Sequence, residues 1–376
     1  MKTILYLQYF DPAAFPPLER SAQQFLDRGW KVHFLGIAPG KTYPKFATLQ
    51  HPALSITLRR HRAGSIRDIA AYHLEALQMI AKLRPDVVYV SQERVALIGL
   101  AASLWPRIVT VLHEHDIPFL PGDRKTVVRF TRTLFARAAD LCVLPQKRRA
   151  EDFRLATGAC RIMVAHNTPL LREIGDAPSR HDRDALILWH HGSLGPSRLP
   201  PALIQALALL PERVSLRFAG YETVNSRGYI QELLGEAARL GIAGRVSYLG
   251  PMDRADLYSA AADCDVGVAL FSRDFPQPMA GASNKPFDFL SSGLPLLTTD
   301  SPEWREFFGA SGVSLFCDPG SAADIAEKLR WFSENPEARY QMALKSYDLI
   351  RREWNYEQSY SPVLAAIERS TRRMDA

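Results

Sequence analysis

The stretch AGASNKPFDFLSSGLPLLTTD, residues 280–300, carries the pattern from which the fold of this protein can be read. Polar residues and helix breakers come first, an apolar pattern with helical spacing follows, and Gly293 precedes an apolar run at 294–297. A Ser, Asn and Pro cluster is typical of a helix start, and a Gly is typical of a helix stop. We therefore predict a loop, a helix and a strand, with Lys285 in the first helical turn.

The same alternation extends along the whole chain. Apolar runs separate amphipathic segments in the first half (TILYLQYF, 3–10; KVHFLGI, 31–37; DVVYV, 86–90) and again in the second (LILWHHGS, 186–193; VSLRFAG, 214–220). Continuous apolar strands between helices indicate parallel sheets covered on both faces. The sequence therefore predicts an α/β protein built from doubly wound, Rossmann-like sheets.

The length of the chain points to two domains. A chain of 376 residues is too long for one ordinary hydrophobic core. A polar, charged and unpatterned segment at 172–185 marks the join. We predict one domain over residues 1–175, a second over 185–355, and a final helical segment over 356–376.

Charge is distributed unevenly between the two halves. The first 175 residues carry 25 Lys and Arg against 14 Asp and Glu, whereas the remainder carries 21 basic and 26 acidic residues. A basic first half implies an anionic partner, which can be a membrane surface, a phosphate-bearing lipid or a nucleic acid.

Several protein classes do not fit the composition. The four cysteines are widely spaced without a C-x-x-C pair, so neither a zinc site nor a disulfide framework is expected. The N-terminus lacks the apolar core of a signal peptide, and no stretch approaches about 18 uncharged apolar residues. These patterns predict a cytoplasmic protein.

The predicted helix after residue 282 has the chemistry of an anion site. Ligands of open α/β sheets lie beyond the carboxyl ends of the strands. Ser283 or Asn284 can cap the helix, its free N–H groups favour an anion, and Lys285 adds a positive charge. Asp288, one turn further on, can accept hydrogen bonds from sugar hydroxyls. The alternative is an ordinary capped helix whose Lys285 and Asp288 face water.

A second polar motif, LHEHDIP at residues 112–118, ends an apolar strand of the first half. His113 and His115 alternate onto one face, and Glu114 and Asp116 onto the other. A His-x-His pair can be half of a metal site or a pair of core histidines. Because no third or fourth ligand is identifiable, we predict no metal site.

The motifs of the second half resemble those of a known family. SNKPFDFLSSGLPLLTTD resembles the NKLFEYMAAGKPVVATD type of segment in retaining glycosyltransferases of the GT-B fold, the glycosyltransferase family 4 group. RVSYLGPMDRADLYSAAADCDVGVALFS and GVSLFCDPGSAADIAEKLRWFSENPEARYQMALKS are similar to that family's later motifs in order and spacing. LERSAQQFLDRGWKVHFLG resembles its first helix and second strand. The resemblance implies two domains facing a central cleft, with residues 356–376 crossing back onto the first domain.

The resemblance also implies a nucleotide-sugar donor held mainly by the second domain. Asn284 and Lys285 would lie near the donor diphosphate, and Asp288 occupies the place of a glutamate that binds the ribose hydroxyls. His113, with Glu114 next to it, would face the reacting sugar; a structural histidine is the alternative. The other donor-binding residues that the resemblance implies are Ser193, Arg198, Gly220, Leu249, Gly250, Met252 and Ser283.

Three positions depart from the family pattern. Ala280 stands where the family often has a glutamate that touches the donor sugar, which leaves the identity of the sugar open. Pro16 and Pro17 replace a Gly-Gly pair, and Pro17 has no N–H for a phosphate. Arg198 is the only nearby candidate for a phosphate-binding cation after the strand at 186–193.

The predicted helix at 125–140 is a candidate membrane contact. Val127, Phe130, Leu134 and Ala138 share one face at helical spacing, which we expect to be buried. The opposite face would be cationic and either dock on anionic lipid or simply face solvent. Nucleic acid fits less well, because aromatic residues are not interleaved with the charges. The basic residues concerned are Lys125, Arg129, Arg132, Lys147, Arg148 and Arg149.

The sequence thus predicts a glycosyltransferase that moves a hexose from a UDP- or GDP-linked donor to a lipid-linked acceptor, with retention of configuration. We expect no metal or other cofactor, and a cytoplasmic protein that is peripheral on the inner membrane face. Two alternatives stay open. One is another GT-B enzyme, an epimerase or an inverting transferase, and the other is a non-catalytic sugar-nucleotide binder, which Ala280 and the prolines would favour.

Overall fold

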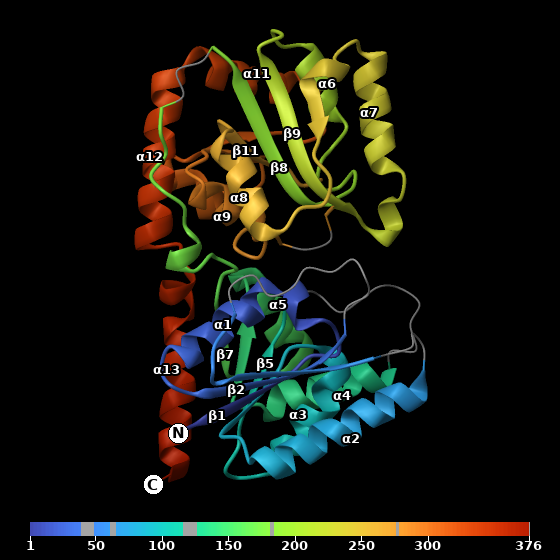
Figure 1. The fold of residues 1–376 in the computed structure, drawn as a ribbon, viewed down its shortest axis with the longest axis vertical. Helices are drawn as coiled ribbons and strands as arrows, with labels where there is room; N and C mark the ends of the chain where they lie inside the picture. Colours follow the sequence, from blue (N-terminus) through green and yellow to red (C-terminus); the bar gives the residue numbers. More distant parts are fainter. Residues whose placement is uncertain (39–48, 61–64, 116–125, 181–183, 276–277, 376) are drawn as a thin grey trace. The chain divides into compact units, whose positions relative to one another are not determined.

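The computed structural model describes the chain except for residues 39–48, 61–64, 116–125, 181–183, 276–277 and 376. It divides into two compact units, Met1–Asn167 with Tyr356–Ala376, and Thr168–Asn355 (Figure 1). Each unit contains its own parallel sheet. The prediction of two doubly wound α/β domains is therefore confirmed.

The first unit is built on a seven-stranded sheet in the order β3-β2-β1-β4-β5-β6-β7. Most of the connections between these strands contain a helix, because parallel neighbours need a crossover. The strands are β1 (Thr3–Leu7), β2 (Lys31–Ile37), β3 (Leu54–Arg59), β4 (Val87–Val90), β5 (Val109–His113), β6 (Leu141–Leu144) and β7 (Ile162–Val164). The α-helices are α1 (Pro16–Leu26), α2 (Ile66–Leu83), α3 (Ala96–Ala102), α4 (Thr126–Ala138), α5 (Lys147–Thr157) and α13 (Tyr356–Asp375).

The register of the central strands aligns their ends. Leu7 of β1 pairs with Val90 of β4, and Val90 pairs with Leu112 of β5. The next residues along these strands, Gln8, Ser91 and His113, are all buried polar residues. They therefore follow one another across the carboxyl edge of the sheet, where ligands of such folds bind.

The C-terminal helix α13 belongs to the first unit, as the predicted return to the first domain requires. It lies beside α1 (Figure 1). Its Tyr356 and Tyr360 are fully buried. The Tyr356 hydroxyl donates to the carbonyl oxygen of Pro17 at 3.2 Å. The helix is thus fastened to the start of α1, where the two prolines stand.

The second unit is built on a six-stranded sheet in the order β10-β9-β8-β11-β12-β13. Its strands are β8 (Leu186–Leu194), β9 (Val214–Glu222), β10 (Val246–Tyr248), β11 (Val266–Ala269), β12 (Leu296–Thr299) and β13 (Ser314–Cys317). Its α-helices are α6 (Ala202–Ala208), α7 (Tyr229–Arg239), α8 (Arg254–Ala262), α9 (Lys285–Ser291), α10 (Pro302–Phe308), α11 (Ala322–Glu334) and α12 (Pro336–Arg352).

Both faces of this second sheet are covered. Leu186 and Leu188 of β8 belong to one hydrophobic core, whereas Ile187 and Trp189 belong to another. Successive side chains of a strand point to opposite faces, so each core fills one side of the sheet. This explains why the strands read as uninterrupted apolar runs.

The boundary between the units falls earlier than the predicted residue 175. The segment after Asn167 packs on the second unit instead of joining the two as a loose linker. Gly175 N–H donates to the Ser291 carbonyl at 3.2 Å, and the buried carboxylate of Glu173 is paired with Arg254. These contacts make the predicted join a part of the second unit.

The predicted orientation of α4 is wrong. Val127 and Phe130, expected in the core, are 71% and 62% exposed, and Arg132, expected on the surface, is only 6% exposed. Arg149 of α5 is also buried, and its guanidinium donates to the His115 carbonyl at 2.9 Å. Arg132 and Arg149 therefore do not belong to the predicted cationic surface.

Other residues of that predicted cationic surface are exposed. Arg129, Lys147 and Arg148 are exposed, and Lys125 lies outside the described residues. Within the described ranges, no helix combines the length and apolar character needed to cross a membrane.

Candidate functional site

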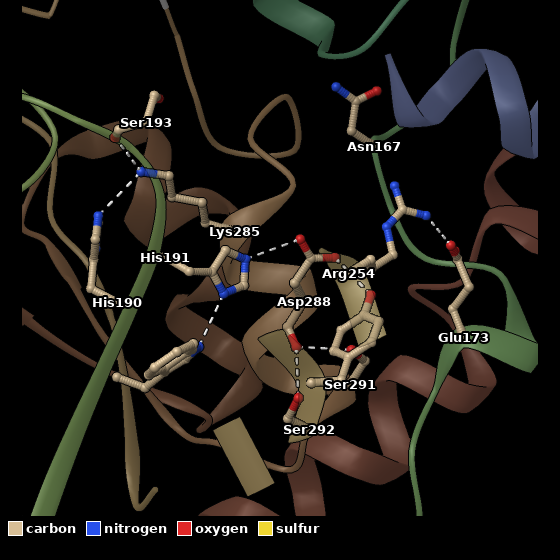
Figure 2. Close-up of polar contacts among 12 residues, drawn as sticks. Asn167, Glu173, His190, His191, Ser193, Arg254, Lys285, Asp288, Ser291 and Ser292 are labelled. Carbon is tan, nitrogen blue, oxygen red and sulfur yellow. Dashed lines mark hydrogen bonds and ion pairs between the residues drawn. The ribbon is translucent and has the colours of Figure 1, made fainter. Parts of the chain in front are cut away.

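Lys285 of the second unit is a charged side chain in a buried position. It begins α9 and is 8% exposed. Its Nζ donates to the Ser193 carbonyl at 3.0 Å and lies 3.2 Å from Nε2 of His190 in β8 (Figure 2). Nδ1 of His190 lies 2.9 Å from the Val268 carbonyl oxygen, which can only accept. The proton of His190 is therefore on Nδ1, and its Nε2 accepts from Lys285.

A second cation, Arg198, lies beside this lysine. Its guanidinium donates to the Ser193 hydroxyl and lies 5.2 Å from the ring centroid of Phe275. Burial lowers the pKa of Lys285 well below its ordinary value, and the charge of Arg198 lowers it further. Among the residues that the structure describes, no carboxylate forms an ion pair with either cation. Two neighbouring like charges, that of Lys285 being buried, favour binding of a multiply charged anion when no counter-charge pairs with them.

Two glycines let the backbones of β8 and β9 approach each other closely near the ends of these strands. Gly192 and Gly220 are register partners with φ angles of +106° and +135°. A Cβ on Gly220 would lie 1.8 Å from the Gly192 carbonyl oxygen, so no other residue fits there. Gly220 N–H donates to the Gly250 carbonyl at 2.9 Å, and the neighbouring Leu249 is 39% exposed. The structure thus brings together the predicted residues Gly220, Leu249 and Gly250.

Asp288 is held by two side chains that the sequence analysis did not identify. One carboxylate oxygen accepts from the Tyr258 hydroxyl at 3.2 Å, and the other lies 3.4 Å from Nε2 of His191 (Figure 2). Trp189 Nε1–H donates to Nδ1 of His191 at 3.0 Å, so the His191 proton is on Nε2 and faces Asp288. The two consecutive histidines in LILWHHGS were the sequence feature that could have identified His191, because polar side chains in a buried strand usually have a hydrogen-bond partner.

The segment before α9 differs from the predicted cap. Asn284 occupies the N-cap position, but its side chain accepts no capping hydrogen bond, and Ser283 is buried. Ala280 is 1% exposed and packs in the core, so it offers no sugar contact. The Glu303 carboxylate accepts from Met279 N–H at 3.2 Å and holds this turn from α10.

The remaining predicted residue, Met252, packs against the core beneath α8 and α9. A cavity of about 430 Å³ lies elsewhere in the second unit, between the segment 172–180, α8 and α12. Tyr258 lines it, but none of the predicted donor-binding residues does. We therefore do not place the predicted donor in that cavity.

His113 of the first unit ends β5 and is fully buried. Its Nδ1 lies 2.7 Å from the Tyr89 hydroxyl, and its ring centroid lies 4.0 Å from that of His115. Burial lowers the pKa of both histidines, that of His115 to about 3. Both are therefore neutral at physiological pH. Within the described part of the chain, no three His, Cys, Asp or Glu side chains gather as metal ligands would.

Glu114 forms a buried ion pair. Both carboxylate oxygens accept from Arg132, each at 2.6 Å, and the Arg132 guanidinium lies 4.8 Å from the Phe153 ring centroid. Such a bidentate pair fixes α4 against the end of β5. We therefore retain His113 as the predicted catalytic residue and assign Glu114 a structural role. Asp116 lies outside the described residues.

The carboxyl edge around His113 contains further buried polar atoms. Both amide atoms of Gln8, the Ser91 hydroxyl and Nε2 of His113 have no hydrogen-bond partner among the described residues. An unpaired buried polar group costs about 1–3 kcal/mol. A hydroxyl-rich ligand would supply the missing partners.

The chain matches two family models, one in each half. The model described as Glycosyltransferase Family 4 matches residues 18–168, and the model described as Glycosyl transferase-like matches residues 201–365. No curated protein matches the chain.

Solved structures share the fold over nearly the whole chain. Anabaena Alr3699/HepE in complex with UDP and glucose is 18% identical, with a TM-score of 0.76 over 98% of this chain and 100% of that one. Sucrose-phosphate synthase from Thermosynechococcus elongatus is 12% identical, with a TM-score of 0.74 over 100% and 99%. WaaG, a glycosyltransferase involved in lipopolysaccharide biosynthesis, is 16% identical, with a TM-score of 0.66 over 96% and 98%. At these identities the likeness establishes the fold.

Proposed function

The protein is a glycosyltransferase of the GT-B fold, since glycosyltransferase models match both of its halves, and we propose that it transfers a hexose from a UDP-linked donor. The HepE structures contain UDP, UDP with glucose, or UDP-glucose, which supports uridine as the nucleoside. The nucleotide sugar would be held at the carboxyl edge of the second sheet.

The observation that carries this proposal is the pair of cations around Ser193, a buried Lys285 and a partly buried Arg198. Lys285 and Arg198 would neutralise the donor diphosphate. Asp288, oriented by His191 and Tyr258, would accept hydrogen bonds from the ribose hydroxyls. His113 would hydrogen-bond the transferred sugar.

The reaction we propose proceeds with retention and without a metal. The bond between the sugar C1 and the diphosphate oxygen breaks, and the acceptor oxygen bonds to C1 on the same face. The acceptor proton passes to the departing diphosphate, so no protein base is required. Lys285 and Arg198 would stabilise the negative charge that grows on the diphosphate, which is the part that a metal ion plays elsewhere.

The acceptor we propose is lipid-linked, and the exposed face of α4 supports a membrane location. Val127 and Phe130 are exposed apolar side chains, and Arg129 between them is exposed as well. Leu97 on the adjoining α3 is 50% exposed. Apolar side chains beside a cation suit the interface of an anionic bilayer.

A product assay tests the proposed function. The protein is incubated with UDP-hexoses and a panel of lipid-linked acceptors, and the products are analysed by NMR. An α-linked product from an α-linked donor supports retaining transfer, and a β-linked product supports an inverting enzyme. A changed free nucleotide sugar supports an epimerase, and UDP binding without turnover over the panel supports a binding protein. His113→Ala should strongly reduce transfer.

A further inference from the structure

Three side chains from distant parts of the chain form a hydrogen-bonded row that ends at His113. Tyr360 of α13 donates its hydroxyl proton to the Tyr89 oxygen at 3.1 Å. Tyr89 of β4 lies with its hydroxyl 2.7 Å from Nδ1 of His113. All three side chains are fully buried.

The row determines where each proton lies. A tyrosine hydroxyl has one proton to donate, and a neutral imidazole has one N–H and one acceptor nitrogen. Because Tyr89 accepts from Tyr360, its own proton is directed to Nδ1 of His113. Burial raises the pKa of both tyrosines well above the ordinary value, so both keep their protons. Nδ1 of His113 then accepts, and the imidazole proton is on Nε2.

We propose that Tyr360 and Tyr89 are positioning residues that fix the Nε2–H tautomer of His113, so that His113 donates a hydrogen bond to the sugar instead of accepting a proton. The proposal rests on the proposed function for its sugar, but the tautomer itself does not. Nε2 is one of the buried atoms without a partner among the described residues, which leaves its N–H for a ligand oxygen.

The surrounding packing holds the row rigid. The Tyr89 ring lies 4.5 Å from that of Tyr6, and Tyr360 stacks on Tyr356 at 5.1 Å between ring centroids. The C-terminal helix therefore contributes one member of the row, and its attachment through Tyr356 and Pro17 keeps that member in place. Helix α13 of the first unit therefore contributes, through Tyr360, to the position of His113.

Nitrogen NMR tests the tautomer without any activity assay. The full-length protein is labelled with ¹⁵N-histidine, and His113→Gln identifies the His113 signals. We expect a pyrrole-type Nε2 and a pyridine-type Nδ1 in the wild type. In Tyr89→Phe the loss of the donor should move both shifts toward the average of the two tautomers, and Tyr360→Phe should have a smaller effect in the same direction. The Tyr360 variant keeps the test available if Tyr89→Phe does not fold.

Tyr72→Phe is the matched control for these variants. Tyr72 is also buried in the first unit, but its hydroxyl donates to the Leu35 carbonyl at 2.9 Å, outside the row. It should leave the His113 shifts unchanged. An Nδ1–H tautomer in the wild type, or a tautomer that Tyr89→Phe does not alter, overturns the proposal.

Kinetic measurements test the positioning role of the two tyrosines separately from the proposed function. Tyr89→Phe should lower kcat about tenfold with donor KM within about twofold, and Tyr72→Phe should change neither. The double variant Tyr89→Phe/His113→Gln should lose no more activity than His113→Gln alone, because the tyrosine acts through the histidine. Additive losses contradict the positioning role. A wild type that transfers no sugar refutes the proposed function, while the NMR result still decides the tautomer.

Discussion

Lys285 combines a positive charge with burial, and its hydrogen-bond partners among the described residues are neutral. A carbonyl oxygen and a histidine nitrogen solvate the ammonium group, but neither carries a charge to offset its desolvation. A bound diphosphate would supply that charge. Two predictions follow from this one side chain.

Lys285→Ala should weaken binding of UDP about 10- to 100-fold, the usual effect of removing a charged hydrogen bond. Binding of uridine should change little, because uridine has no phosphate for the ammonium group to contact. Calorimetry with both ligands measures the difference. Lys328→Ala, which removes a partly exposed lysine of the same unit, is the control. Equal losses for UDP and uridine would remove the phosphate assignment.

Binding of UDP should take up protons at pH values between the pKa of Lys285 in the free protein and its pKa in the complex. Burial lowers the pKa of Lys285 in the free protein, and a bound diphosphate favours the charged form and raises the pKa. Affinity should therefore fall as pH rises through the pKa of the free protein. Calorimetry in buffers of different ionisation enthalpy measures the uptake, which Lys285→Ala should reduce. Proton release on binding contradicts the assignment.

The helix α4 is oriented by one ion pair at its buried face. The apolar pattern of α4 alone places Val127 and Phe130 inside, yet Glu114 at the end of β5 draws Arg132 into the interior. Reversing this arrangement would leave a buried carboxylate without a partner, which costs more than exposing two apolar side chains. The position of the whole helix face thus depends on a residue of a neighbouring strand.

Arg132→Met should destabilise the protein by about 3–5 kcal/mol, because the Glu114 carboxylate is left buried and unpaired. The double variant Glu114→Gln/Arg132→Met should lose less than the two single variants together. Urea unfolding measures these differences. Arg129→Met, an exposed position one turn earlier, should change stability by less than about 0.5 kcal/mol. A loss for Arg132→Met no larger than that of Arg129→Met would contradict a stabilising pair.

The outer face of α4 should bind anionic liposomes. Val127→Ser with Phe130→Ser should reduce co-sedimentation with vesicles that contain phosphatidylglycerol, since apolar side chains no longer enter the interface. Binding should also weaken with salt, because a cation contributes to it. Ile66→Ser, an equally exposed apolar position on α2, is the control. Binding that survives the double substitution places the membrane contact elsewhere.

The whole molecule buries neutral histidines in both units. His113 and His115 lie in the first unit and His190 in the second, and burial lowers the pKa of all three. In the unfolded chain these groups titrate near their ordinary value. The unfolded state therefore binds more protons below about pH 6.5, so the free energy of unfolding falls with falling pH.

Stability should drop by about 1.4 kcal/mol per pH unit for each such histidine below about pH 6.5. Urea unfolding at pH 7.5 and 5.5 measures the slope for the whole chain. His115→Gln should make the slope shallower, because one fewer histidine takes up a proton on unfolding. A slope that His115→Gln leaves unchanged would show that this side chain is not buried in neutral form.

The sequence was sufficient for the architecture and for the local positions of several candidate site residues in the second unit. Strand and helix periods are local properties, and parallel sheets require uninterrupted apolar strands, so the alternation alone predicted two doubly wound domains. The position of Lys285 at a helix start and of Gly220 at a strand end was equally local. Their proximity follows from the rule that strand ends share one edge.

Only the tertiary structure decided the partners of these side chains. Tyr360 and Tyr89 are 271 positions apart, and His191 and Asp288 are 97 positions apart, so no local pattern connects them. The buried face of α4 could not be predicted from its own apolar pattern either. A buried Glu114 without a partner would cost more free energy than the exposure of the apolar side chains. The sequence by itself determined the fold, whereas the tertiary structure determined which side chains are partners, because those contacts join residues that only folding brings together.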